Sequence, residues 1–277
     1  MQMAQVSGSQ SSANILVENT FIPSTYLDRE VIVDFYLPKN IADLSSINLL
    51  LINDGQDLPK FHFQTMLDEL LRQQEIEPLL CVGIHCSKER KMEYGTVAYS
   101  DYKGRGARAG MHKNFVLEEL VPFIQKNYHL DGFKKKAYAG FSLGGLSAID
   151  MVWNHPEEFS IAGVFSGSLW WRLKSLDDDY VEETDRIMHK QVREGIFKPG
   201  LKFYFTTGSL DEKMDRNHNG IIDSIDDTMG LIEELEKKGY DRENDIFYKN
   251  YENGRHDVFT WGKAMPDFLK WGWGIKR

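Results

Sequence analysis

A serine between two glycines is the residue of this chain best placed to do chemistry. Residues 140–145 read Gly-Phe-Ser-Leu-Gly-Gly, so Ser142 lies in a Gly-x-Ser-x-Gly pattern. A strand-like run ends before Gly140, and a helix-like run begins at Leu146. On a sharp strand-to-helix turn, a serine hydroxyl projects above the sheet, where it can attack an acyl carbon. The alternative is a glycine-rich turn in which Ser142 only caps a helix.

Such a serine needs a histidine base, because its hydroxyl is a poor nucleophile at neutral pH. In enzymes with this turn, the catalytic residues follow in the order Ser, Asp or Glu, His. Of the eight histidines, only His218 and His256 follow both Ser142 and a candidate acid. We favour His256, which lies in a turn-like stretch between the last predicted strand and an apolar helix. Its alternative role is that of a surface or helix-capping histidine.

The acid and the oxyanion donors come from two further loops. The predicted strand at residues 201–205 leads to Asp211, which we assign as the acid, with Glu212 as the alternative one residue later. Backbone N–H groups near the nucleophile and in the loop after the third strand form the oxyanion hole in this arrangement. These are the N–H groups of Leu143 and Gln56.

A loop at residues 215–226 has the register of a calcium-binding loop. Gly220 stands at position 6, where such loops turn sharply. The candidate ligands, at positions 1, 3, 5, 7, 9 and 12, are Asp215, Asn217, Asn219, the carbonyl of Ile221, Asp223 and Asp226. Oxygen donors of this kind favour Ca²⁺ over Zn²⁺. We expect a structural ion that fixes the nearby Asp211; the alternative is an acidic, Asn-rich surface turn.

Strands alternate with helices along the whole chain. Strand-like runs are predicted at 14–17, 31–36, 47–52, 79–83, 136–139, 161–165, 201–205 and 245–248, and helices at 61–73, 115–127, 146–155, 228–238 and 264–271. This alternation predicts an α/β fold, with antiparallel strands at the start of a mostly parallel sheet and helices on both faces. We expect a flexible leader at 1–13, a single domain at 14–277, and loops at 174–183 and 194–200. In such a sheet, ligands bind beyond the carboxyl ends of the strands, where the candidate residues converge.

The composition of the chain narrows the classes of molecule that it is expected to bind. The chain has 277 residues and a net charge of −9, which disfavours nucleic acids and anionic membranes. No apolar run is long enough to span a bilayer. The two cysteines, Cys81 and Cys86, fit a reducing compartment. Residues 1–13 lack the basic start and apolar stretch of a secretory signal, so we expect a cytoplasmic protein, or an exported one if a signal has been removed. The oligomeric state is left open.

With these residues in place, the chain resembles the esterase D / enterochelin esterase-like family of α/β hydrolases. The resemblance is carried by Asp-Gly-Gln-Asp at 54–57, the turn at 140–145, Ser-Gly-Ser-Leu-Trp-Trp at 166–171 and Gly-Arg-His at 254–256. It implies an α/β-hydrolase fold and a serine esterase that cleaves a siderophore-type, aryl or acetyl ester through an acyl-enzyme, without a catalytic cofactor. Acyl transfer to a sugar, thioester hydrolysis and an inactive, calcium-dependent binding module are the alternatives.

Two tryptophans and three arginines are candidates for contacts with the substrate. Trp170 and Trp171 could stack on an aromatic or sugar ring, or simply pack in the core. Arg105, Arg108 and Arg255 could meet an anionic substrate group, or serve as surface charges. The expected substrate is a small-molecule or carbohydrate ester.

Overall fold

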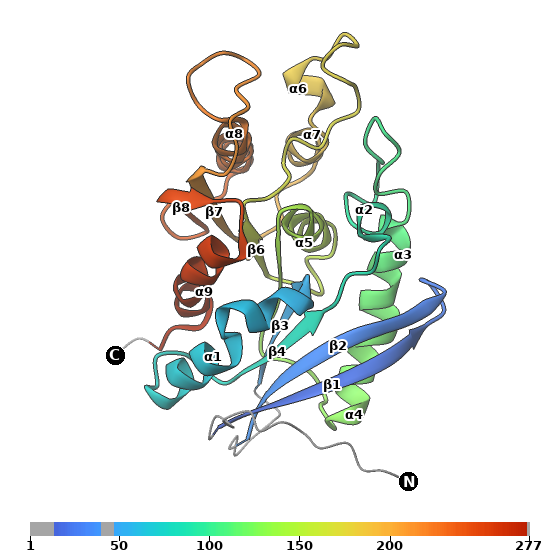
Figure 1. Cartoon of the computed structure of the whole chain (residues 1–277), viewed down its shortest axis with the longest axis vertical. Coiled ribbons are helices and arrows are strands. Elements are labelled where there is room, and N and C mark those ends of the chain that lie inside the picture. Colours follow the sequence, from blue (N-terminus) through green and yellow to red (C-terminus); the bar gives the residue numbers. More distant parts are fainter. Residues whose placement is uncertain (1–13, 40–46, 276–277) are drawn as a thin grey trace.

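The computed structural model describes residues 14–39 and 47–275 (Figure 1). The predicted leader at 1–13 lies outside these residues. Among the helices described, none combines the length and apolar character that crossing a membrane requires.

One eight-stranded sheet runs through the molecule. Its strands are β1 (Ile15–Ser24), β2 (Arg29–Pro38), β3 (Asn48–Asn53), β4 (Leu79–Ile84), β5 (Lys136–Phe141), β6 (Ile161–Phe165), β7 (Lys202–Leu210) and β8 (Ile246–Arg255). They are ordered β1-β2-β4-β3-β5-β6-β7-β8. The β1–β2 and β2–β4 pairs are antiparallel, and every other pair is parallel. The predicted sheet, antiparallel at its start and otherwise parallel, is therefore confirmed.

Helices cover both faces of this sheet (Figure 1). They are η2 (Gly55–Phe61), α1 (Phe63–Arg72), α2 (Arg90–Glu93), α3 (Ala109–Asn114), η3 (Phe115–Leu120), α4 (Val121–Asn127), α5 (Leu143–Asn154), α6 (Glu182–Asp185), α7 (Ile187–Glu194), α8 (Asp223–Lys238) and α9 (Val258–Trp273). Helices α1 and α9 pack on one face, whereas η3, α4, α5, α7 and α8 pack on the other. Strand β3 shows why the central strands are continuously apolar: Leu49 and Leu51 belong to one core, and Leu50 and Ile52 to the other.

Several boundaries differ from the sequence prediction. Strands β7 and β8 continue past their apolar centres to Leu210 and Arg255, because their polar ends still pair with each other, with an irregularity between Gly208 and Leu210. The short helix α7 was not predicted. Helix α5 begins at Leu143, directly after the candidate nucleophile.

Candidate active site

The backbone at Ser142 has the strained conformation of a tight strand-to-helix turn. Its φ and ψ are 54° and −119°, outside the regions that residues with side chains normally adopt. A Cβ atom on Gly140 would lie 2.4 Å from the carbonyl carbon of Gly144. One on Gly144 would lie 2.8 Å from Oδ2 of Asp54. The turn therefore requires glycine on both sides of the serine, and the N–H of Ser142 holds it to the sheet by donating to the carbonyl of Phe165 (2.9 Å).

Ser142 opens onto a cavity of about 320 Å³ at the carboxyl ends of the parallel strands. Its lining is Ser142, Ser166, Gly167, Ser168, Trp170, Asp211, Glu212, Ser224 and His256. The structure thus brings the predicted nucleophile, base and acid to one cavity, with Trp170 beside them. The Oγ atoms of Ser142 and Ser168 lie 3.3 Å apart. Among the hydrogen bonds of the described residues, none directly joins Ser142, His256 and Asp211.

His256 lies in the short connection between β8 and α9. Its ring meets the ring of Trp261 edge-on, with centroids 5.3 Å apart. The indole N–H of Trp261 donates to Oγ of Ser166 (3.1 Å), so the surface beneath the imidazole is itself anchored. Loss of hydration lowers the pKa of His256, and Arg90 lowers it further, while Asp211 acts in the opposite direction. The imidazole is therefore biased towards its neutral form, in which it can accept a proton.

Asp211 and its neighbour Glu212 both reach the cavity, but their surroundings differ. Asp211 is buried, and its Oδ2 accepts from the backbone N–H of Gly208 (2.9 Å). Burial raises the pKa of Asp211, while the Gly208 N–H, the Ser166 hydroxyl and the charge of His256 counteract the rise. Burial also raises the pKa of Glu212, whose charged neighbours are other carboxylates rather than His256.

A close approach of two glycines brings the loops of Asp211 and His256 together. A Cβ on Gly208 would lie 2.4 Å from the carbonyl oxygen of Gly254 and 2.8 Å from Oδ1 of Asp211. Only glycine fits such a backbone contact. Gly254 belongs to the Gly-Arg-His run noted in the sequence, but its partner Gly208 gave no comparable signal.

The two predicted oxyanion donors lie at helix starts. Leu143 is the first residue of α5 and Gln56 the second of η2, positions where helix geometry leaves N–H groups without an intrahelical acceptor. A Cβ on Gly55 would lie 2.3 Å from the carbonyl carbon of Gly83, so the η2 loop is pressed onto β4. The side-chain oxygen of Gln56 accepts from the N–H of Cys86 (3.1 Å), which ties this residue to the segment after β4.

A partly buried ion pair ties the η2 loop to the turn at Ser142, and sequence reasoning missed it. Nε and Nη2 of Arg90 donate to the two carboxylate oxygens of Asp54, each at 2.7 Å. The same Nη2 also donates to the carbonyl of Phe141 (3.3 Å), the residue directly before Ser142. Nδ2 of Asn53 donates to the carbonyl of Gly144 (3.0 Å). These contacts fix the Gln56 loop relative to the turn at Ser142.

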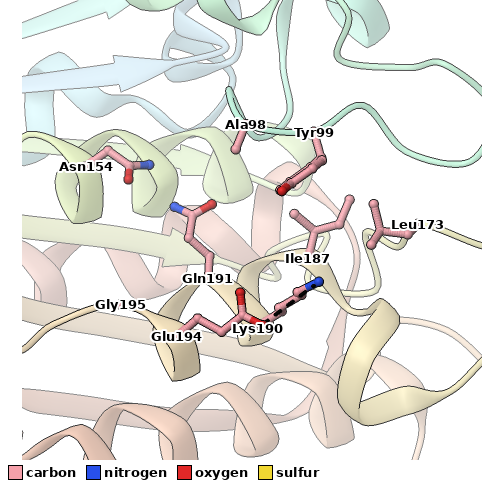
Figure 2. A pocket seen from close by; sticks show the side chains of 9 residues that line it. All are labelled: Ala98, Tyr99, Asn154, Leu173, Ile187, Lys190, Gln191, Glu194 and Gly195. Atoms are coloured by element: carbon pink, nitrogen blue, oxygen red, sulfur yellow. Dashed lines mark ion pairs between the residues drawn. The ribbon is translucent and has the colours of Figure 1, made fainter.

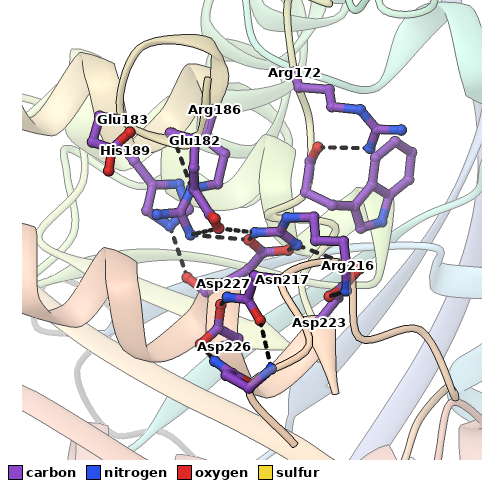
Figure 3. A network of polar contacts seen from close by, with 12 residues as sticks. Arg172, Glu182, Glu183, Arg186, His189, Arg216, Asn217, Asp223, Asp226 and Asp227 are labelled. Carbon is purple, nitrogen blue, oxygen red and sulfur yellow. Dashed lines mark hydrogen bonds and ion pairs between the residues drawn. The ribbon is translucent and has the colours of Figure 1, made fainter. Parts of the chain in front are cut away.

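The loop at 215–226 brings four of the predicted calcium ligands together by hydrogen bonds, and Figure 3 shows two of them, Asn217 and Asp226. Asp226 accepts from the amides of Asn217 (3.1 Å) and Asn219 (3.0 Å), and Asp215 accepts from the N–H of Asn219 (3.1 Å). Asp223 instead accepts from the N–H of Arg216 (2.8 Å), a bond that involves none of these four side chains. Within residues 14–39 and 47–275, no three His, Cys, Asp or Glu side chains come together as a metal cluster.

Of the other residues predicted to contact the substrate, one lines the cavity and the rest are in the core, paired or at the surface. Trp171, predicted as a pocket residue, is fully buried and packs against Gly95 and Gly106, so it belongs to the core. Arg105 is paired with Asp101, and Arg108 donates to the carbonyl of Leu27 (2.7 Å). Arg255 is exposed at the end of β8. Trp170 alone of the two tryptophans lines the cavity.

A second cavity, of about 280 Å³, lies between α5, α7 and the loop at Ala98 and Tyr99 (Figure 2). Lys190 and Glu194 of α7 line it and face each other at 4.0 Å. None of the predicted catalytic residues borders this cavity. We therefore place the candidate active site at Ser142.

Known proteins are similar to this chain along most of its length. Residues 24–271 match the model of the Esterase family, described as "Putative esterase". The chain is 24% identical over 255 residues to the uncharacterized protein YjcH of Bacillus subtilis (strain 168), covering 89% of this chain and 93% of the relative.

Solved structures of low sequence identity share the fold. Enterochelin esterase from Shigella flexneri superposes with a TM-score of 0.69 at 19% identity, covering 92% of this chain but only 57% of its own length. Siderophore hydrolase EstB from Aspergillus nidulans gives a TM-score of 0.70 at 16% identity and covers 100% of both chains. The predicted α/β-hydrolase fold is confirmed. Because the family model matches most of the chain, the protein belongs to the Esterase family.

Proposed function

We propose that the protein is a serine esterase whose nucleophile is Ser142. The observation that carries this proposal is the placement of Ser142, on its strained turn, in one cavity with His256 and Asp211. Membership of the Esterase family supports ester hydrolysis as the reaction.

In the proposed mechanism, Oγ of Ser142 attacks the ester carbonyl while His256 takes its proton. Asp211 orients the imidazole and stabilises its protonated form. The tetrahedral oxyanion is held by the N–H groups of Leu143 and Gln56, and loss of one such donor typically costs about 3 kcal/mol. His256 then protonates the departing alcohol, which leaves an acyl-enzyme. Water, activated by His256, releases the acid and restores Ser142.

The cavity supports a small acyl or aryl group as the part bound beside the nucleophile. Its volume of about 320 Å³ and the indole of Trp170 suit a ring that stacks on an aromatic surface. Similar structures include an enterochelin esterase, a siderophore hydrolase and a ferulic acid esterase. We therefore place aryl and siderophore-type esters first. Product analysis with an added acceptor alcohol separates hydrolysis from acyl transfer.

Covalent labelling and steady-state kinetics test the nucleophile. A fluorophosphonate probe is expected to add one label to the native chain, and p-nitrophenyl butyrate to give a burst of p-nitrophenol. Ser142→Ala abolishes both, whereas the control Ser160→Ala, at the opposite end of the parallel strands, retains both. Labelling or turnover that survives in Ser142→Ala would disprove this assignment. Absence of label in the native chain would favour the inactive binding module.

Calcium at the 215–226 loop is a second proposal. Its support is the register of the loop together with the grouping of Asp215, Asn217, Asn219 and Asp226. Asp223 accepts from the N–H of Arg216 instead of joining this group. Ca²⁺ is expected to raise the Tm of the native chain, and chelation to reverse the rise. Asp226→Ala should lose this response, and Asp241→Ala, in a turn after α8, should keep it. Equal melting with Ca²⁺ and with chelator would refute the site.

A further inference from the structure

Arg172 follows two residues after Trp170, which lines the cavity of Ser142, and its guanidinium lies among aromatic rings. Its guanidinium carbon lies 4.9 Å from the ring centroid of Tyr102 and 5.9 Å from the centroids of both Trp170 and Tyr180. Its Nη1 lies 3.5 Å from the carbonyl oxygen of Trp170. Contacts of this kind hold a guanidinium in place and favour its positive charge. These contacts restrict the orientations that are open to the Arg172 side chain.

The charge of Arg172 is not neutralised by any carboxylate of the described residues. Within the described parts of the chain, its guanidinium has no acidic partner within 4.0 Å, although acids lie nearby in the fold. Those acids are taken by other cations: Asp101 by Arg105, Asp185 by Lys174, and Asp227 by Arg186 and Arg216. In Figure 3, Arg172 stands apart from the network that joins Arg186, Arg216 and Asp227.

The hydrogen bonding of Arg172 is also incomplete. Its Nε–H is buried and has no acceptor among the described residues. A buried donor without an acceptor costs free energy, and more so when it belongs to a charged group. Arg105 also lies over Trp170 (4.9 Å), but the carboxylate of Asp101 offsets its charge. The group formed by Asp101, Arg105, Trp170 and Arg172 thus carries one positive charge that no carboxylate of the described residues offsets.

We infer that Arg172 binds an anionic group, most simply a carboxylate, on the substrate of the Ser142 site. Trp170 connects Arg172 with the Ser142 site, because its side chain lines the cavity and contacts the guanidinium. An ester that carries an aromatic ring and a carboxylate on its acyl part would place the ring against Trp170 and the carboxylate on the planar fork of Arg172. This inference rests on the proposed esterase function, and it names Arg172 as a determinant of specificity.

Two esters of equal shape test it. One is 4-nitrophenyl 4-carboxybenzoate; the other, 4-nitrophenyl 4-carbamoylbenzoate, replaces the carboxylate by a neutral amide. The quantity measured is the ratio of their kcat/KM values at pH 7.5. The native enzyme is expected to prefer the carboxylate, and Arg172→Met to lower the ratio about tenfold, the size of one charge-assisted hydrogen bond. Rising salt concentration should lower the native ratio as well.

Arg242→Met is the matched control, because Arg242 is a surface arginine paired only loosely with Glu236 (3.9 Å). The ratio of the two kcat/KM values in this variant should equal the native ratio. Arg172→Lys keeps the charge but not the planar fork, so its ratio should fall severalfold. This variant decides the matter if Arg172→Met does not fold. An Arg172 variant that folds and keeps the native ratio overturns the inference. If Ser142→Ala still hydrolyses both esters, the proposed function fails instead.

Discussion

Substitution of Gly140 by alanine tests whether backbone crowding holds Ser142, the proposed nucleophile, in place. The new Cβ would lie 2.4 Å from both the carbonyl carbon and the carbonyl oxygen of Gly144, and 2.9 Å from the nitrogen of Gly145. Ordinary contacts begin near 3.4 Å, so the first turn of α5 must move by about 1.0 Å (3.4 − 2.4). All three atoms are backbone, and no side-chain rotation relieves the contact.

The shift should affect activity more than stability. Overpacking of this kind costs about 1–3 kcal/mol of unfolding free energy, a fall of several degrees in Tm for a chain of this size. A displacement of about 1 Å at the nucleophile is enough to lower kcat/KM about a hundredfold. The assay is p-nitrophenyl butyrate hydrolysis together with a thermal melt of each variant.

Two glycine controls separate these effects. Gly132→Ala meets no atom within 4 Å and should change neither quantity. In Gly163→Ala, the new Cβ lies 2.8 Å from the side chains of Ala139 and Phe268, so Tm should fall while kcat/KM is largely kept. Our reasoning is refuted if Gly140→Ala folds and retains kcat/KM within threefold of the native value.

Three further predictions concern groups around Ser142. Asp211→Asn should lower kcat for p-nitrophenyl butyrate about ten-thousandfold, as loss of a triad acid does, whereas Glu212→Gln should lower kcat far less. A larger loss of kcat in Glu212→Gln than in Asp211→Asn would identify Glu212 as the acid. The acid limb of the plot of kcat/KM against pH should lie below pH 6.5. Loss of hydration and the charge of Arg90 lower the pKa of His256, so the imidazole stays neutral as the pH falls. An acid limb above pH 7 would contradict this explanation. Asp54→Asn breaks the ion pair with Arg90 and should lower the free energy of unfolding by about 1–3 kcal/mol, at the lower end because Arg90 is partly exposed. It should also slow turnover by freeing the Gln56 loop. A native-like unfolding free energy together with a native-like turnover rate would show that the pair does not position this loop.

The sheet was predictable where strands are buried on both faces. Strands β3 to β6 have almost wholly buried side chains, so their sequences are nearly continuous apolar runs. The ends of β7 and β8 carry polar residues such as Ser209 and Asn253, and pairing rather than composition makes them strands. Helix α7 has only eight residues and follows a polar segment, so its pattern was too short to indicate a helix.

The sequence alone determined the turn at Ser142, because the steric demand for glycine at positions 140 and 144 is local and is written in adjacent residues. Chain order likewise identified His256 and the acid loop as candidates. The tertiary structure decided the different surroundings of Asp211 and Glu212, the Asp54–Arg90 pair across 36 residues, the core position of Trp171 and the unpaired charge of Arg172. These depend on which distant segments meet, and burial and charge pairing exist only once those segments have packed together.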